Sequence, residues 1–281
     1  MNRSIIKYFL ASAISKITVS LKAIAFFIVS IFASQSSALT KEVNILFFGN
    51  IEKSHFAGIT LGVEEANLQG KFLNFQYNLI ENPSKMQLEF INEPIAIITN
   101  RNTGQLRLLA EQFLESPVFN TASKSNSIRE ECFENVLNIV PSQRMLDDAR
   151  EQWRNISKFE EINALAWHPD FKKFAASQLN NRFKEKFQKP MDDGSWSGWV
   201  SVKIIAESII QNNMPEDLLY EIKSISNFDG QKGIGLSFRE TGQLRQPILL
   251  ANSNKLLGYA PVKGVTSTTN LDSLGITECY K

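Results

Sequence analysis

The chain has 281 residues, with 30 Lys and Arg against 29 Asp and Glu and only two histidines and two cysteines. This length allows one large or two small domains with a sizeable core. The near-neutral charge excludes the basic footprint that nucleic acid or an anionic membrane surface requires, so neither is expected as a partner.

Residues 1–38 predict a secretory signal peptide. Residues 1–22 contain four basic and no acidic residues, and Ala23–Ala33 (AIAFFIVSIFA) is apolar except for one serine. Ser36 and Ala38 are small residues that suit a cleavage site, whereas a membrane span needs roughly 20 apolar residues. An uncut N-terminal anchor is the alternative. After cleavage the chain has 26 basic and 29 acidic residues, and we expect a periplasmic protein without a stable membrane span.

Export bears on the two cysteines. In an oxidising compartment, Cys132 and Cys279 are expected to form a disulfide that holds the C-terminal tail to the body of the fold. Two unpaired thiols are the alternative. The histidines, His55 and His168, are isolated from each other and from cysteines. We therefore expect no metal site.

The first 140 residues alternate between strand and helix patterns. Apolar runs predict buried strands at 43–48, 95–98, 117–119 and 136–140, and alternation predicts a further strand at 75–79. Apolar residues recur at helical spacing over 56–67 and 106–114. The alternation predicts an α/β fold with a doubly wound parallel sheet.

The remaining chain is helical first and then extended. Pro141-Ser142 opens a helix with Ser142 as its N-cap. Further apolar stripes predict helices over 171–187, 196–209 and 215–225. After Asp229-Gly230 the pattern is one of strands and turns, at 234–238 and 245–251, and the end from Pro261 is polar and loop-like.

Motifs for catalysis are absent from the sequence. It has no Gly-rich phosphate loop, no serine-hydrolase elbow, no zinc-protease helix and no calcium loop. A nucleophile needs a base within reach, and His168 suits a structural role. The pairs Asp147-Asp148 and Asp192-Asp193 suit caps or solvated faces. We expect no catalytic residues, no cofactor and no enzymatic activity.

A binding site is predicted where the parallel strands end. Three loops, 50–56, 99–104 and 120–125, lead from strand ends toward helix N-termini. Such N-termini favour carboxylates and other anionic groups. For each polar residue, ordinary helix capping is the alternative role. The predicted ligand-binding residues are Phe56, Asn100, Asn102, Thr103, Asn120, Thr121 and Ser123.

Several stretches resemble a known group. The helix FAGITLGVEEAN (56–67) and CFENVLNIVPS (132–142) resemble type I periplasmic binding proteins, which include branched-chain amino-acid receptors of ABC importers. Residues 166–191, 228–251 and the terminal LDSLGITECY are similar to one subgroup, the substrate-binding proteins associated with PQQ-dependent alcohol oxidation. The resemblance covers most of the chain after residue 38.

One departure from that group is large. Its members have two lobes that close on a ligand, but here only 151–165 separates the landmarks that flank the second lobe, which needs on the order of 100 residues. We expect 39–141 and 166–251 to form lobe one, 142–165 to form a short helical bridge in place of most of lobe two, and 252–281 to form a C-terminal segment. Trp153 and Trp167 flank the bridge and are expected to cover surface that lobe two would shield.

The resemblance implies a function. It indicates a periplasmic substrate-binding component of an ABC importer, or a shortened descendant. Such a protein would bind a small polar solute linked to PQQ-dependent alcohol oxidation and would work with an ABC permease. The alternative is a one-lobed interaction protein that binds a partner or dimerises and no longer captures solute. A third interpretation is a product of internal deletion without retained activity.

Overall fold

The computed structural model describes residues 40–91, 95–157, 161–252 and 255–279, so the predicted signal peptide lies outside the described residues. A five-stranded sheet forms its centre, in the order β2-β1-β3-β4-β5, and every neighbouring pair is parallel. This confirms the predicted parallel, doubly wound sheet. The strands are β1 (Lys41–Phe48), β2 (Phe75–Glu81), β3 (Ala96–Thr99), β4 (Val118–Asn120) and β5 (Val136–Asn138).

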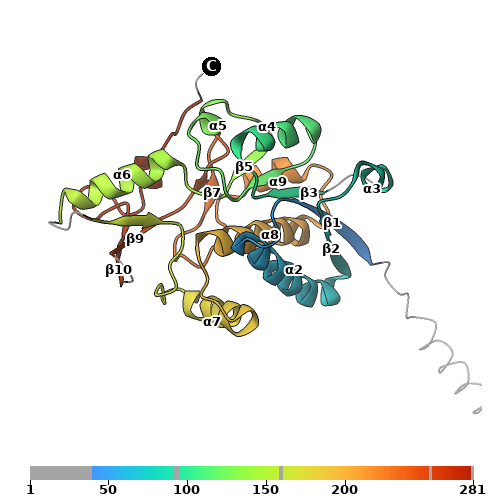
Figure 1. The fold of residues 1–281 in the computed structure, drawn as a ribbon, viewed down its shortest axis with the longest axis horizontal. Coiled ribbons are helices and arrows are strands. Elements are labelled where there is room, and N and C mark those ends of the chain that lie inside the picture. Colours follow the sequence, from blue (N-terminus) through green and yellow to red (C-terminus); the bar gives the residue numbers. More distant parts are fainter. Residues whose placement is uncertain (1–39, 92–94, 158–160, 253–254, 280–281) are drawn as a thin grey trace, which may run out of the picture. The chain divides into compact units, whose positions relative to one another are not determined.

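Helices cover both faces of this sheet because successive strand residues point to opposite sides. In β1, Val43, Ile45 and Phe47 join the largest core cluster, while Leu46 joins a second cluster on the other face. The first face carries α2 (Ser54–Leu73), α7 (Ala176–Phe187), α8 (Asp193–Asn212) and α9 (Leu218–Ser224), and the second carries α3 (Lys85–Phe90), α4 (Thr103–Gln112) and α5 (Ser127–Glu130) (Figure 1).

The two longest helices pack closely because glycines line their contact. A Cβ on Gly58 of α2 would lie 1.8 Å from the Ser195 carbonyl oxygen of α8. A Cβ on Gly198 of α8 would lie 2.1 Å from the His55 carbonyl oxygen of α2. Only residues without a side chain permit this approach.

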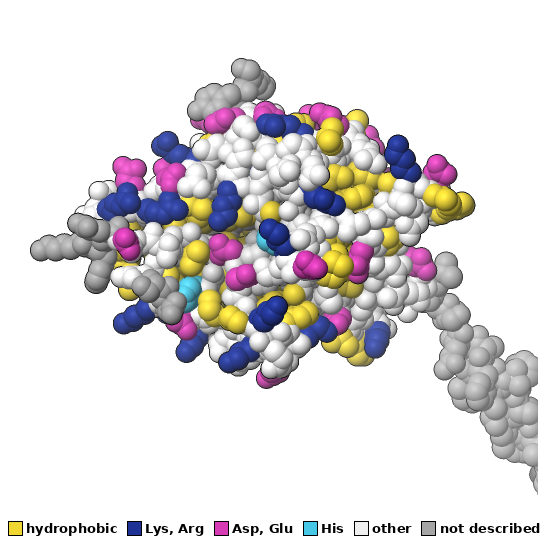
Figure 2. Space-filling model, viewed as in Figure 1, with side chains coloured by type: hydrophobic (Ala, Val, Ile, Leu, Met, Phe, Trp, Pro, Cys, Tyr) yellow, Lys and Arg dark blue, Asp and Glu magenta, His cyan; other side chains and the backbone are white. Residues whose placement is uncertain are grey.

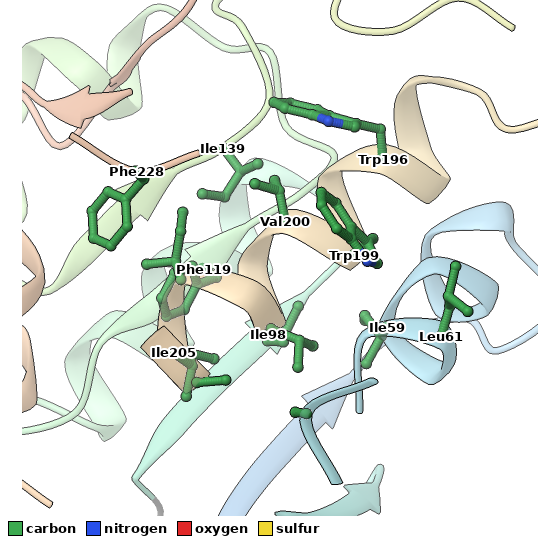
Figure 3. Close-up of a cluster of buried hydrophobic side chains, with 14 of the residues drawn as sticks. Ile59, Leu61, Ile98, Phe119, Ile139, Trp196, Trp199, Val200, Ile205 and Phe228 are labelled. Carbon is green, nitrogen blue, oxygen red and sulfur yellow. The ribbon is translucent and has the colours of Figure 1, made fainter. Parts of the chain in front are cut away.

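The sheet and α8 share the main core. Ile98 of β3 and Phe119 of β4 face Val200 and Ile205 of α8, and all four side chains are fully buried (Figure 3). Burial on this scale is the main stabilising contribution to a domain of this size. We call the five-stranded sheet with its helices the main body.

A second, smaller group of elements has its own core. It consists of α6 (Gln143–Arg154), β6 (Asn163–Leu165), β9 (Ile248–Asn252) and β10 (Lys255–Ala260). The three strands form an antiparallel sheet in the order β10-β9-β6, and α6 packs on it through Met145, Leu146 and Ala149. Figure 1 shows α6, β9 and β10 together, apart from α2 and β2. We call this group the small body.

The small body adds detail to the predicted domain ranges. The expected bridge, 142–165, contains the strand β6 as well as a helix, and the expected C-terminal segment, 252–281, contains β10 and a 3-10 turn, Leu271–Ser273. Strand β9 falls in the range expected for lobe one but pairs with β6. From Lys41 onward the chain forms one compact unit. The ranges themselves stay a prediction.

Some sequence predictions need correction. The helix expected over 171–187 begins only at Ala176, because Phe174 and Ala175 have left-handed φ values of 54° and 67°. The expected strands over 234–251 divide into β7 (Ser237–Phe238), β8 (Leu244–Arg245) and β9. Trp167 lies in the main core, 1% exposed and stacked on Trp196, so the hypothesis that it covers an open surface is wrong.

The predicted disulfide is confirmed. Cys132 and Cys279 are bonded, with their Cα atoms 5.8 Å apart, within the usual range. The bond ties the C-terminal tail to the main body just after α5. In the described part of the chain, no helix is long and apolar enough to cross a membrane.

Candidate functional site

Three loops meet at one edge of the main sheet. Because β1, β3 and β4 are parallel neighbours, their carboxyl ends lie at the same edge. The loops that follow them, 49–53, 100–102 and 121–126, lead to the N-termini of α2, α4 and α5. We call this set of loops the carboxyl edge, and all seven predicted ligand-binding residues lie on it or beside it.

Two of the predicted residues hold the loops in place. The Asn100 side chain donates to the Asn50 carbonyl oxygen at 3.0 Å and accepts from the Asn50 N–H at 2.9 Å. The Asn102 side chain accepts from the Gln105 N–H at 3.1 Å and so caps α4. For Asn102 the capping role is therefore present. Asn102 is exposed and Asn100 is half-buried, which leaves part of each side chain at the surface.

The predicted residues on the 120–125 loop are buried and bonded to one another. The fully buried Asn120 side chain donates to Asn138 at 2.8 Å and accepts the Ser123 N–H at 2.8 Å. Thr121 donates to the last carbonyl oxygen of β3 at 2.8 Å, and the Ser123 and Thr103 hydroxyls are 2.6 Å apart. The structure thus brings these residues together, and their polar atoms stabilise the loops. Contact with a ligand stays a prediction.

The start of α2 presents an apolar wall and a histidine. Phe56 is half-buried, with its ring 5.1 Å from that of Phe47. The neighbouring His55 has a buried Nδ1 without a hydrogen-bond partner in the described structure. Burial lowers the pKa of His55, while the Asp192 charge and the Thr121 backbone oppose this shift. Sequence reasoning treated His55 as isolated, although it lies within the predicted loop 50–56.

The loops of the carboxyl edge carry three cations against one carboxylate, that of the exposed Glu52. Lys53 and Lys124 are exposed there and Arg101 is half-buried. Lys53 is the N-cap of α2 and gives the helix no side-chain hydrogen bond, so the positive end of this dipole is not neutralised by a capping side chain. Asp192 nearby caps α8 by accepting from the Ser195 N–H at 2.8 Å, in agreement with its expected role. The arrangement suits a small carboxylate.

Two hollows of the described surface lie on α6, away from the carboxyl edge. One of about 330 Å³ on α6 is bordered by polar groups that are already bonded: Asp148 accepts from the Gly275 N–H at 2.7 Å, and Gln152 accepts from the Val262 N–H at 2.9 Å.

His168 is buried, and its Nδ1 accepts from the Asp170 N–H at 3.1 Å, which fits the expected structural role. The described residues contain no group of three side chains placed to hold a metal.

Charge on the surface is mixed. Figure 2 shows Lys and Arg side chains interspersed with Asp and Glu over the face in view. A nucleic-acid interface concentrates basic side chains on one face or stripe. The face in view does not have that distribution.

Known proteins share this fold. No protein-family model and no curated protein sequence matches the chain. The ABC transporter substrate-binding protein from Desulfitobacterium hafniense in complex with Leu is similar, with a TM-score of 0.64 and 11% identity over 78% of this chain and 100% of that chain. A branched chain amino acid ABC transporter periplasmic ligand-binding protein from Burkholderia xenovorans has a TM-score of 0.62 and 11% identity over 77% and 95% of the two chains.

A third solved structure extends the likeness. The ABC transporter solute binding protein from R. palustris in complex with benzoate has a TM-score of 0.58 and 10% identity over 79% of this chain and 96% of that chain. The chain therefore has the type I periplasmic binding protein fold. At these identities the likeness concerns the fold alone.

Proposed function

We propose that this chain is a periplasmic solute-binding protein of an ABC importer, and not an enzyme. One observation carries the proposal: its parallel sheet has the fold seen in solved structures of ABC transporter substrate-binding proteins. On this proposal the N-terminal segment directs export, and an ABC permease is the partner.

The solute would bind at the carboxyl edge. The uncapped start of α2 and the cations Lys53, Arg101 and Lys124 favour a negatively charged group. Asn100 and Asn102 offer exposed amide surface, and Phe56 offers an apolar wall. These features support a small solute with a carboxylate and an apolar portion. Leucine and benzoate, present in the similar structures, have that chemistry.

Two finer points also belong to the proposal. The small body would be the shortened second lobe, because it begins at the expected helix and has a hydrophobic core of its own. A link to PQQ-dependent alcohol oxidation is supported only by the sequence resemblance of residues 166–191 and 228–251.

Thermal unfolding with a panel of solutes tests the proposal. The panel contains leucine, isoleucine, benzoate, small aliphatic acids, alcohols and quinone cofactors. A solute that binds the native state stabilises it by mass action and so raises the melting temperature. At a ligand concentration a hundredfold above the Kd, the unfolding free energy increases by about 2.7 kcal/mol. At least one carboxylate is expected to produce a concentration-dependent rise. A flat response across the panel would overturn solute binding, and light scattering that shows a dimer would favour the interaction-protein alternative.

A further inference from the structure

Three crossovers connect the main body to the small body. Residues 139–142 lead from β5 into α6, residues 166–175 lead from β6 to α7, and residues 246–247 lead from β8 to β9. A hinge bends only if its backbone angles change and its bonds to neighbouring segments open. The bonds that hold these crossovers therefore decide whether the two bodies move relative to each other.

A buried arginine holds the first crossover. The Arg129 guanidinium is fully buried and donates from Nη2 to the Val140 carbonyl oxygen at 2.7 Å. Its other bonds go to the Ser123 and Ser125 carbonyl oxygens at 2.7 and 2.8 Å and to the Gln243 amide at 2.8 Å. All these partners are neutral oxygens: three are backbone carbonyl oxygens and one belongs to the Gln243 side chain. Movement of the crossover would leave part of a buried cation without a partner, which is costly.

A buried lysine holds the third crossover. Lys232 is 3% exposed and donates to the Gln246 side chain at 2.7 Å and to the Pro247 carbonyl oxygen at 3.2 Å. Its ammonium group also lies 3.9 Å from the ring centroid of Trp196 on α8, a cation–π distance. Gln246 in turn donates to the Ile139 carbonyl oxygen at 2.6 Å. The first and third crossovers are thus bonded to each other as well as to the main body.

The second crossover and the start of α6 are held in the same way. The Trp167 N–H donates to the Asp193 carboxylate at 2.7 Å, and its indole donates to Asn180 at 2.9 Å. At the start of α6, the Gln143 N–H donates to the Lys124 carbonyl oxygen at 2.8 Å, and the Arg144 N–H donates to the Asn126 side chain at 3.0 Å. Loop 121–126 of the carboxyl edge therefore anchors the small body directly.

The C-terminal tail adds a fourth connection. Arg239 of the main body donates to the Asp272 carboxylate at 2.7 Å and to the Leu271 carbonyl oxygen at 2.6 Å. The same tail contributes Leu274 to the core of the small body and ends in the disulfide to Cys132. The tail thus spans both bodies.

From these contacts we propose that the small body is locked to the main body. The protein keeps one arrangement of the two bodies, and any solute binds without a clamshell closure. Arg129 and Lys232 are positioning residues of this lock. The proposal is independent of the proposed function, because it holds whether or not a solute binds.

Distance measurement by pulsed electron paramagnetic resonance tests the lock. Spin labels are placed by Gln69→Cys on α2 and Glu151→Cys on α6, both exposed positions, in the full chain with its native disulfide intact. We expect a single narrow distance distribution that stays unchanged when excess leucine is added. Two populations without leucine, or a shift of the distribution with it, would overturn the lock.

A matched pair of variants tests the assigned residues. Lys232→Met combined with Gln246→Leu removes the bonds of the third crossover and is expected to broaden the distribution. Lys203→Met is the control: it removes a lysine that lies 6.0 Å from the ring centroid of Trp199 on α8, outside the crossovers, and is expected to leave the distribution as it is. An unchanged distribution in the double variant would refute the role of Lys232.

Hydrogen exchange of the unaltered protein makes the test independent of variant folding. Peptides covering 139–146 and 244–250 are expected to exchange as slowly as β4, because locked segments open only with the main body. Exchange about a hundredfold faster than that of β4 would show local opening of the crossovers and contradict the proposal.

Discussion

At the scale of single residues, Lys232 is expected to make the stability of the protein depend on pH. Burial lowers its pKa to about 7, and the charge of Asp193 opposes this shift. The two oxygen acceptors and the Trp196 ring also favour the ammonium form. Because the pKa in the folded state lies below the ordinary 10.5, the unfolded chain keeps this lysine protonated up to a higher pH than the folded protein does. The unfolded state then binds more protons between these two values, and stability rises with pH across that window.

The expected outcome is a difference between two pH profiles. Between about pH 7 and pH 10, the unfolding free energy of the native sequence should rise relative to that of Lys232→Met by on the order of 1–3 kcal/mol. Urea unfolding at a series of pH values measures this difference. Parallel profiles for the two proteins would mean that Lys232 keeps its charge when folded across the whole range.

Other residues show why the sequence alone could not define the candidate site. The capping of α4 by Asn102 follows from its position before a helical stripe, and capping was the alternative role considered for it. The sequence around Lys232 and Arg129 gives no local sign that these two side chains are buried, since both residue types are usually exposed. Their partners Gln246 and Gln243 follow more than ten residues later in the chain, at distances that only the folded structure reveals.

At the scale of elements, the contact between α2 and α8 depends on glycine. The Gly58→Ala variant places a methyl group 1.8 Å from the Ser195 carbonyl oxygen, and backbone atoms cannot yield as a flexible side chain would. The helices must therefore separate. We expect a loss of stability of about 1–3 kcal/mol by overpacking.

Gly104 provides the matched control. It lies in the first turn of α4, and the nearest atom to a Cβ there is 3.6 Å away, an ordinary contact. Because alanine favours a helix over glycine, Gly104→Ala should be neutral or stabilising by up to about 1 kcal/mol. Denaturant unfolding compares the two variants. Equal stability of Gly58→Ala and the native protein would contradict the described helix contact.

Element prediction succeeded where the periodic signal was long. The strand at 43–48 and the helix over 56–67 correspond to β1 and α2, since their apolar residues repeat with clear periods. The sequence pattern did not predict the strands β6 and β10. β6 has three residues, and pairing with the distant β9 holds it, so neither its length nor its pattern stood out. The start of α7 was misplaced because left-handed backbone at Phe174 and Ala175 has no marker such as glycine.

At the scale of the whole molecule, the described chain joins a parallel sheet of the type I periplasmic binding protein fold to a smaller body with its own core. The alternation of strands and helices was enough to predict the parallel sheet. The short interval between landmarks predicts that most of a second lobe is missing, and this stays a prediction. It did not reveal that α6, β6, β9 and β10 build a body with its own core. That body draws on segments about 100 residues apart, and local patterns do not reveal such pairings.

On the proposed function, the carboxyl edge captures a small solute. Hydrogen exchange with and without the panel solute that raises the melting temperature most tests it directly. We expect slower exchange in the peptides that contain 50–56 and 99–104, with no change around the hollow on α6. Protection confined to residues 144–155 and 273–275, or no protection at the carboxyl edge, would contradict it.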